Sequence, residues 1–207
     1  MSIDTLATTH LLALAAALGW ASGLRLYAVV FFTGLAGAMG WVPLPAGLQL
    51  LQHPLVLGAA GLMLAVEFFA DKVPGLDSLW DGLHTFLRIP AGAALAGAVF
   101  GGDQAAWATA AALLGGTLAA TSHVAKATTR AAVNTSPEPF SNIALSLAGD
   151  ALVPTMLWLA VAHPLWFGLA LALLVVASVV LTLVLFKFLR LLVRKLRGRL
   201  GGKPVAV

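Results

Sequence analysis

The sequence predicts an all-α, polytopic transmembrane helical bundle of about seven spans, arranged as three hairpins followed by a C-terminal helix. Three observations lead to this prediction. Hydrophobic residues make up 60% of the 207 residues and charged residues only 10%, whereas a soluble domain has roughly 45–50% apolar and about 25% charged residues. The apolar residues form long stretches separated by short polar segments. Threaded through a membrane, these stretches leave every basic residue on one side.

The expected spans follow the apolar stretches. The first two are shorter than the ~20 residues of a straight crossing, so a tight hairpin, one broken helix and a re-entrant pair all remain open for them. The fourth span could start as early as Leu83, and the fifth should continue as helix to Ala132. The expected spans are residues 5–20, 26–41, 55–70, 89–102, 105–124, 143–162 and 164–186.

The segments between the spans are polar or contain proline. Residues 42–54 should lie at the membrane surface, with Trp41 at headgroup depth. Residues 71–88 form a polar, partly amphipathic stretch, and residues 134–142 form a loop with two prolines. The second and third hairpins are faintly similar to each other, which leaves both an internal repeat and a chance likeness of small-residue helices open.

The distribution of Lys and Arg sets the expected orientation. With the C-terminus in the cytoplasm, a seven-span path leaves Asp4, Asp103, His53 and His163 in the outer loops, without a basic residue. We therefore expect a multi-pass protein of a bacterial inner membrane, with the N-terminus outside and the C-terminus in the cytoplasm. Arg25 would fall on the outer side in a six-span path, which favours seven spans.

The chain divides into one transmembrane domain, residues 1–186, and a basic cytoplasmic tail, residues 187–207. Seven of the twelve basic residues lie in this tail. We expect the tail to bind anionic lipid at the membrane surface, and we expect no nucleic-acid partner. The tail residues concerned are Lys187, Arg190, Arg194, Lys195, Arg197, Arg199 and Lys203.

The chain contains no cysteine, which excludes disulfides, thiolate zinc sites and iron–sulfur clusters. The common signatures of zinc proteases, serine hydrolases and nucleotide-binding proteins are absent as well. We expect no cofactor. Runs of small residues such as AGAALAGA permit close helix contacts within the chain or in a homo-oligomer.

Two groups of charged residues lie near the ends of expected spans. Glu67 and Asp71 share one helical face, which suits a cation or proton site but also a structural ion pair near the interface. His123, Lys126 and Arg130 form a basic stripe at the same expected depth. Opposite charges at matching depth predict pairing between the two helices; the alternative is that the long basic side chains reach the headgroups as anchors.

Asp150 lies near the middle of the sixth expected span. An ionised carboxylate there is expected to face the bundle interior, because translocon scales give it a cost of about 2.5–3.5 kcal/mol in lipid. Arg25, a hydroxyl such as Ser146 or Thr155, or a backbone group freed by Pro154 could be its partner. We regard Asp150 as the strongest candidate for a functional residue.

Asp77, Asp81 and His84 follow helical spacing within the polar stretch. A solvated face of an interfacial helix is the simpler interpretation of this cluster in a cytoplasmic loop. A divalent metal site is the alternative, and the sequence does not say which metal it would hold.

Three segments resemble a bacterial membrane family catalogued as domain of unknown function 4126: GWASGLRLYAVVFFTGL, EFFADKVPGLDSLWDGLHTFLRIPAGA and GGTLAATSHVAKATTRAAVNTSPEPFSN. The resemblance covers roughly residues 11–164. It implies a membrane protein and carries no activity with it.

Two functions are compatible with these residues. The first is a small-solute or cation transporter, with Glu67, Asp71 and Asp150 as ligand or titratable carboxylates and Arg25, Lys126 and Arg130 as counter-charges. The second is a membrane scaffold or assembly factor, whose buried charges fix helix register. Transport predicts a polar cavity that reaches into the membrane, and scaffolding predicts a filled core. A lipid-acting enzyme is a third interpretation; no nucleophile–base pair is recognisable, and Ser122 next to His123 remains open.

Overall fold

The computed structural model describes residues 8–73, 75–135 and 140–200. This part of the chain is all-helical and contains no strand. The elements in order are α1 (Thr8–Ala38), η2 (Ala46–Gln52), α2 (Pro54–Ala70), α3 (Leu76–Ala98), η3 (Gly102–Gln104), α4 (Ala105–Val133), α5 (Phe140–Ala162) and α6 (Pro164–Leu200). Two residues with an expected location, Asp4 on the outer side of the membrane and Lys203 in the cytoplasm, are not among the described residues.

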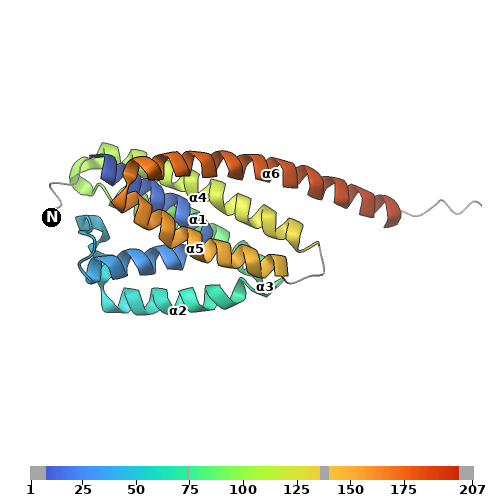
Figure 1. Ribbon diagram of the computed structural model, residues 1–207, viewed down its shortest axis with the longest axis horizontal. Coiled ribbons are helices and arrows are strands. Elements are labelled where there is room, and N and C mark those ends of the chain that lie inside the picture. The colour runs from blue at the N-terminus through green and yellow to red at the C-terminus, as the bar shows by residue number, and fades with distance from the viewer. Residues whose placement is uncertain (1–7, 74, 136–139, 201–207) are drawn as a thin grey trace, which may run out of the picture.

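Helix α1 consists of two arms that meet at Arg25, where the backbone leaves the helical region with φ −148° and ψ 85°. Leu14 on the first arm and Thr33 on the second line the same cavity, whereas a straight helix would hold them roughly 28 Å apart. The second arm therefore runs back alongside the first (Figure 1). The first two expected spans thus form a reversing pair joined at Arg25.

Three helices are long and apolar enough to cross a membrane: Thr8–Ala38, Phe140–Ala162 and Pro164–Lys195. The bent pair Ala46–Gln52 and Pro54–Ala70 makes a fourth candidate if its two parts count as one span. These helices agree with the membrane protein and helical bundle that the sequence predicts. By length and composition alone, they amount to fewer spans than the expected seven.

The first arm of α1 forms the centre of the bundle. Ala17, Leu18 and Ala21 on this arm are completely buried, and α3, α4 and α5 pack around it (Figure 1). Small residues permit this close packing: a Cβ atom added at Gly19 would lie only 2.4 Å from the Cα of Gly115 on α4. Such contacts are typical of membrane helices, where small residues let backbones approach each other.

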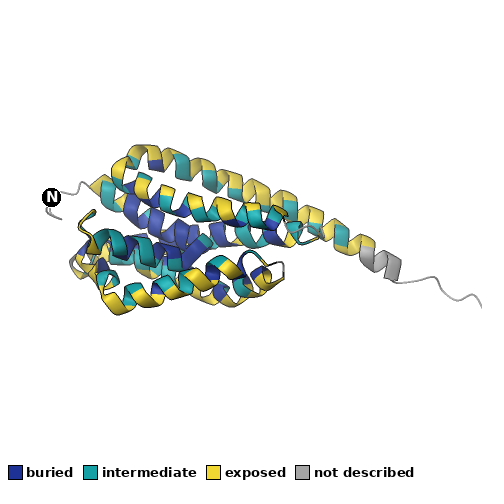
Figure 2. Cartoon of the chain, turned by 60° about the horizontal axis from the view of Figure 1, so that its bottom comes forward, coloured by how far each residue is buried: buried dark blue, intermediate teal, exposed yellow. Residues whose placement is uncertain are grey.

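The outer helices expose many large apolar side chains, and Figure 2 shows exposed residues along most of α6. Two helices differ in length from the sequence prediction. Helix α6 continues well past residue 186, where we placed the end of the membrane domain. Helix α3 begins at Leu76, so most of the polar stretch before the fourth expected span belongs to the same helix as that span, and its acids Asp77 and Asp81 pair with bases of α4.

Candidate functional site

Ten charged side chains form one connected network inside the bundle. Its five acids and five bases are linked by ion pairs of 2.6 to 3.7 Å, so the network is neutral when all ten are ionised. The acids are Glu67, Asp71, Asp77, Asp81 and Asp150; the bases are Arg25, Lys72, Arg88, Lys126 and Arg130. Every Lys and Arg that precedes the tail belongs to it.

The turn of α1 places Arg25 in the network. Its guanidinium is only 2% exposed, and Nη2 lies 2.9 Å from Asp150 Oδ1 and 3.0 Å from Asp71 Oδ2. The same nitrogen donates to the carbonyl and hydroxyl oxygens of Ser146 at 3.1 and 3.0 Å. Asp150 thus faces the bundle interior and pairs with Arg25, which confirms the sequence prediction for its environment.

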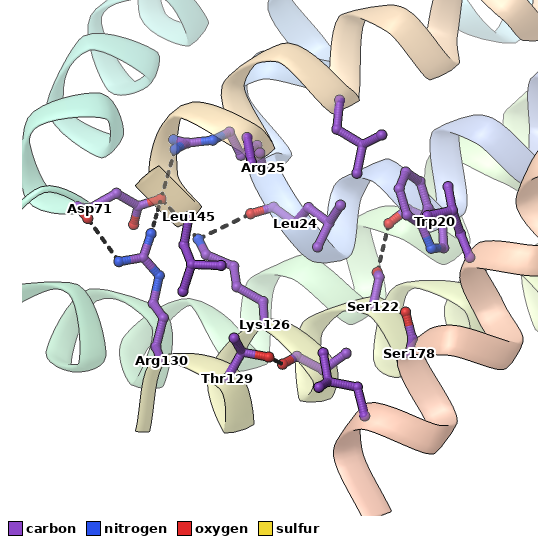
Figure 3. Close-up of a pocket in the computed structure, with 16 residues that line it drawn as sticks. Trp20, Leu24, Arg25, Asp71, Ser122, Lys126, Thr129, Arg130, Leu145 and Ser178 are labelled. Carbon is purple, nitrogen blue, oxygen red and sulfur yellow. Dashed lines mark hydrogen bonds and ion pairs between the residues drawn. The ribbon is translucent and has the colours of Figure 1, made fainter. Parts of the chain in front are cut away.

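Asp71 and Asp81 are the two acids that each contact three bases. Besides Arg25, Asp71 Oδ2 contacts Lys126 Nζ at 3.0 Å and Arg130 Nη2 at 3.3 Å (Figure 3). This confirms the predicted pairing between the end of α2 and the basic stripe of α4. The alternative, in which Lys126 and Arg130 serve only as headgroup anchors, is wrong because both are held by buried carboxylates. Glu67 makes a different contact: its Oε1 accepts from Arg88 Nη2 at 2.6 Å.

The interpretation of Asp77, Asp81 and His84 as a solvated face is wrong. Asp77 is fully buried, and Asp81 and His84 are nearly so. Asp77 and Asp81 lie on the face of α3 that packs against the basic stripe of α4: Asp81 Oδ1 lies 2.9 Å from Lys126 Nζ and Asp77 Oδ2 lies 2.9 Å from Arg130 Nη1. His84 contacts α1 instead, where its Nε2 lies 3.0 Å from the Tyr27 hydroxyl. Helical spacing identified the shared face correctly, but not what covers it.

Asp77 also organises the start of α3. Its Oδ1 accepts from the backbone N–H groups of Gly75 and Ser78 at 2.8 and 2.6 Å. Burial disfavours the charged carboxylate, but hydrogen bonds from Arg130, the backbone of Ser78 and Asn134 outweigh it, so the pKa of Asp77 lies below its ordinary value. The carboxylate is therefore ionised at neutral pH, as its ion pair with Arg130 requires.

His123 and Ser122 point into different surroundings, although they are neighbours on α4. His123 Nε2 lies 2.8 Å from Thr85 Oγ1, and its Nδ1 lies 3.4 Å from Arg88 Nη1. The Ser122 hydroxyl donates to the carbonyl of Trp20 at 2.6 Å. The two residues form no nucleophile–base pair. Their adjacency in the sequence therefore no longer supports the interpretation as a lipid-acting enzyme.

Two network members escaped the sequence analysis. Arg88 pairs with Glu67 and Asp81, and its position seven residues after Asp81 on the same helix was a usable signal. Lys72 pairs with Asp150 at 3.3 Å. It follows Asp71 directly in the chain, and no spacing rule connects it to a residue 78 positions further on.

A cavity of about 240 Å³ adjoins the network on the side of α5 and α6. Figure 3 shows Arg25, Asp71, Lys126 and Arg130 converging at one end of it. Apolar residues of α1, α5 and α6 form the rest of the wall, together with the hydroxyl-bearing residues Ser122, Thr129 and Ser178. The site therefore combines a charged end with a mainly apolar wall.

Three buried polar atoms at the charged end lack a hydrogen-bond partner among the described residues: Arg25 Nη1, Asp71 Oδ1 and Arg130 Nε. Arg130 Nε still lies 3.7 Å from the carboxylate oxygen Oδ2 of Asp81. A buried donor or acceptor without a partner is costly, so Arg25 Nη1 and Asp71 Oδ1 are suited to a bound molecule or water. In the part of the chain that the structure describes, no group of three or more His, Asp or Glu is placed to hold a metal ion.

One comparison with known proteins gives a match. A family model described as a domain of unknown function, 4126, matches residues 12–183, which include all ten members of the charge network. No curated protein and no solved structure matches the chain.

Proposed function

The chain belongs to the family described as domain of unknown function 4126, and we propose that it is a small-solute transporter of the bacterial inner membrane. The site is the network of ten charges together with the adjoining cavity. Asp71 lines the cavity, and Arg25 links Asp71 to Asp150.

The reversal of α1 at Arg25 is the observation that carries this proposal. Irregular backbone at membrane depth is tolerated only where protein buries it or where it lines a cavity. In secondary transporters, broken helices of this kind build the substrate and ion sites near the middle of the bilayer. Here the break carries an arginine that contacts acids of two other helical segments, Asp71 after α2 and Asp150 on α5.

The cavity supports the same proposal. A scaffold needs only a filled core, whereas a cavity adjoins the charged end of this site, and two buried polar atoms there, Arg25 Nη1 and Asp71 Oδ1, have no hydrogen-bond partner among the described residues. Ion pairs that share partners can also exchange them: Asp71 contacts three cations, and Asp81 contacts Lys126, Arg88 and Arg130. A network with several alternative pairings suits a site that must change state during transport.

We further propose that the chain passes through the membrane seven times, with the two arms of α1 counted separately. The arms run in opposite directions, and Figure 1 shows the reversal of α1, the α2–α3 turn and the C-terminal end of α6 away from the end that carries the N-terminus. The five bases of the network then belong to the cytoplasmic half of the protein, as the positive-inside rule requires.

A scaffold or assembly factor is the rival function. It is favoured by the exact balance of five acids and five bases, each with at least one ion pair. Buried ion pairs can fix helix register without taking part in transport. The rival predicts that removal of a single charge changes stability or assembly and leaves no solute flux to lose.

Electrical recordings on proteoliposomes test the two functions. Full-length protein would be adsorbed on a solid-supported membrane and exposed to concentration jumps of H⁺, Na⁺, K⁺, acetate, dodecanoate and small amines. We expect a protein-dependent transient current with at least one of them. Asp150→Asn keeps the shape of the side chain and removes its charge, so it should reduce that current at least tenfold.

The matched control is Thr155→Ala, one turn further along α5. Thr155 is exposed and its hydroxyl bonds only to the carbonyl of Ala151 in its own helix, at 2.7 Å, so this variant should transport normally. Folding of both variants is checked by size-exclusion chromatography and thermal unfolding. Currents equal to those of empty liposomes across the panel, or a folded Asp150→Asn protein that transports normally, would contradict the proposal.

A further inference from the structure

We propose that the cavity binds the acidic headgroup of a single-chain amphiphile drawn from the membrane. The headgroup lies against Arg25, Lys126 and Arg130, and the hydrocarbon chain lies along the crevice between α5 and α6. This inference rests on the proposed transport function in one respect: it names the class of solute that the site carries. The binding itself is a separate property and is tested separately.

The charged side chains that line the cavity indicate that the headgroup is an anion. Four charged side chains line the cavity, and three of them, Arg25, Lys126 and Arg130, are cations. They share the single lining acid, Asp71, through one oxygen. Asp71 is thus the only carboxylate that these cations meet on the cavity side, although each of them also pairs with an acid that does not line the cavity. A second anion at this end would add charge-assisted hydrogen bonds, which are the strong ones for carboxylate or phosphate.

The remaining charges of the network do not cancel this preference at the cavity. Asp77 and Asp81 contact the same cations, but they lie on α3 and do not line the cavity. Asp150 pairs with Arg25 and Lys72 and likewise lies outside the lining. These acids therefore pair with the cations without lining the cavity, and three of the four charged side chains that do line it are cationic.

A free donor marks where the headgroup would bind. Arg25 Nη1 is completely buried and has no partner among the described residues, while Nη2 of the same guanidinium makes all the contacts of Arg25 to Asp71, Asp150 and Ser146. An oxygen of a carboxylate or phosphate at Nη1 would satisfy it. Asp71 Oδ1, also without a partner, could accept from a protonated headgroup or a water.

The walls indicate that the ligand carries a hydrocarbon chain. Leucines of α5 and α6 line the cavity beyond its charged end: Leu145, Leu152, Leu174 and Leu181. Leu181 is 42% exposed on the outer surface of the bundle, so this wall continues onto the surface that faces lipid. Helix α6 packs more extensively on α4 than on α5, and α5 and α6 diverge from their connection in Figure 1.

A purely soluble anion fits less well. It would use the charged end but leave the apolar wall uncovered, and it would have to cross the apolar mouth to enter. A lipid-derived carboxylate or phosphate enters sideways from the membrane and covers both parts. The cavity of about 240 Å³ is small beside the roughly 300–1,000 Å³ of pockets for drug-sized ligands, which favours one chain over two.

Binding of radiolabelled dodecanoate to purified full-length protein, measured by scintillation proximity in a non-ionic detergent, tests the inference. Dodecyltrimethylammonium has the same chain with a cationic head, methyl dodecanoate has a neutral head, and acetate has the head without the chain. We expect unlabelled dodecanoate to displace the label, and each of the three others to do so at least tenfold less effectively. Displacement by acetate or inorganic phosphate at equal concentration would overturn the amphiphile in favour of a soluble anion.

Two tryptophan variants on one helix locate the site. Ser178 lines the cavity, so Ser178→Trp should fill it and weaken dodecanoate binding at least tenfold. Val176 is 61% exposed on another face of α6 and does not line the cavity, so Val176→Trp should bind as the wild-type chain does. If Ser178→Trp does not fold, Leu181→Trp enters the same cavity from a position nearer the surface. Equal binding by folded cavity variants and the control would overturn the inference.

The outcome is distinguishable from that of the transport proposal. Specific dodecanoate binding without any dodecanoate-driven current upholds the binding site and contradicts transport. A current driven by another solute, without displaceable dodecanoate binding, upholds transport and overturns the acidic amphiphile as the ligand.

Discussion

Arg25 Nη2 and Asp150 Oδ1 lie 2.9 Å apart and join the turn of α1 to the middle of α5. Neither residue has an opposite charge on its own helix, so each is paired only by residues of other elements. The contact therefore couples the position of the α1 turn to the packing of α5. Because Arg25 also contacts Asp71, the same guanidinium connects the C-terminal end of α2 to the α1 turn and to α5.

Removal of the Arg25 charge should strongly destabilise the protein. In Arg25→Ala, the carboxylates of Asp71 and Asp150 lose a partner inside the bundle, and breaking a buried pair typically costs about 3–5 kcal/mol. Thermal unfolding in detergent should show a clear fall in melting temperature. Arg190→Ala, an exposed residue of α6, is the matched control and should leave it unchanged.

Coupling between the two residues can be measured as well. If the pair acts as a unit, Arg25→Ala combined with Asp150→Asn should lose less stability than the sum of the two single variants. Strict additivity would mean that the contact contributes nothing specific, and the role given to the α1 turn would then be wrong.

Asp71→Asn should be more harmful than Glu67→Gln, although both are conservative changes at fully buried acids. Asp71 contacts Arg25, Lys126 and Arg130, so its neutralisation removes one ion-pair partner from three cations at once. Glu67 contacts only Arg88 among the described bases, and Arg88 retains Asp81. Unfolding of the two variants, compared side by side, checks this order; a larger loss for Glu67→Gln would contradict it.

Part of the site could be predicted from the sequence because the expected spans assign each charged residue a depth in the membrane. A carboxylate inside an apolar run needs a partner, and Lys126 and Arg130 were the basic residues expected at the depth of Asp71. The same reasoning placed Asp150 in the interior. It required no knowledge of the fold beyond the number of helices between the residues.

The rest depended on packing that sequence patterns do not contain. Residues 77, 81 and 84 lie close to one face in any helix, but only the tertiary structure places α4 against Asp77 and Asp81 and α1 against His84. The reversal at Arg25 is similarly hidden, since a hairpin, a broken helix and a re-entrant pair have the same composition. Lys72 was missed because its partner, Asp150, lies on a different helix far along the chain.

The proposed topology predicts opposite locations for the two ends of the chain. Reporter fusions at Asp4 and at Val207, with one enzyme active only in the periplasm and another only in the cytoplasm, should place the N-terminus outside and the C-terminus inside. The physical reason is the cytoplasmic retention of Lys and Arg. Both ends on one side would contradict the seven-span path and would require α1 to count as a single crossing.

Gly19 and Gly168 should respond in opposite directions to the same substitution. A Cβ at Gly19 would meet the Cα and carbonyl oxygen of Gly115 at 2.4 and 2.8 Å, so Gly19→Ala must push the first arm of α1 away from α4. Overpacking of this kind typically costs about 1–3 kcal/mol. At Gly168 on α6 nothing lies within 4 Å of the added atom, and Ala favours a helix over Gly by roughly 0.5–1 kcal/mol.

Thermal unfolding of the two variants should therefore give a lower melting temperature for Gly19→Ala and an unchanged or slightly higher one for Gly168→Ala. Because the α1 arm carries Arg25 into the charge network, the displacement should reach the site. Gly19→Ala should also weaken dodecanoate binding, whereas Gly168→Ala should not. A Gly19→Ala protein as stable as the wild-type chain would mean that α1 and α4 do not approach each other at Gly115, and the position given to Arg25 would lose its structural support.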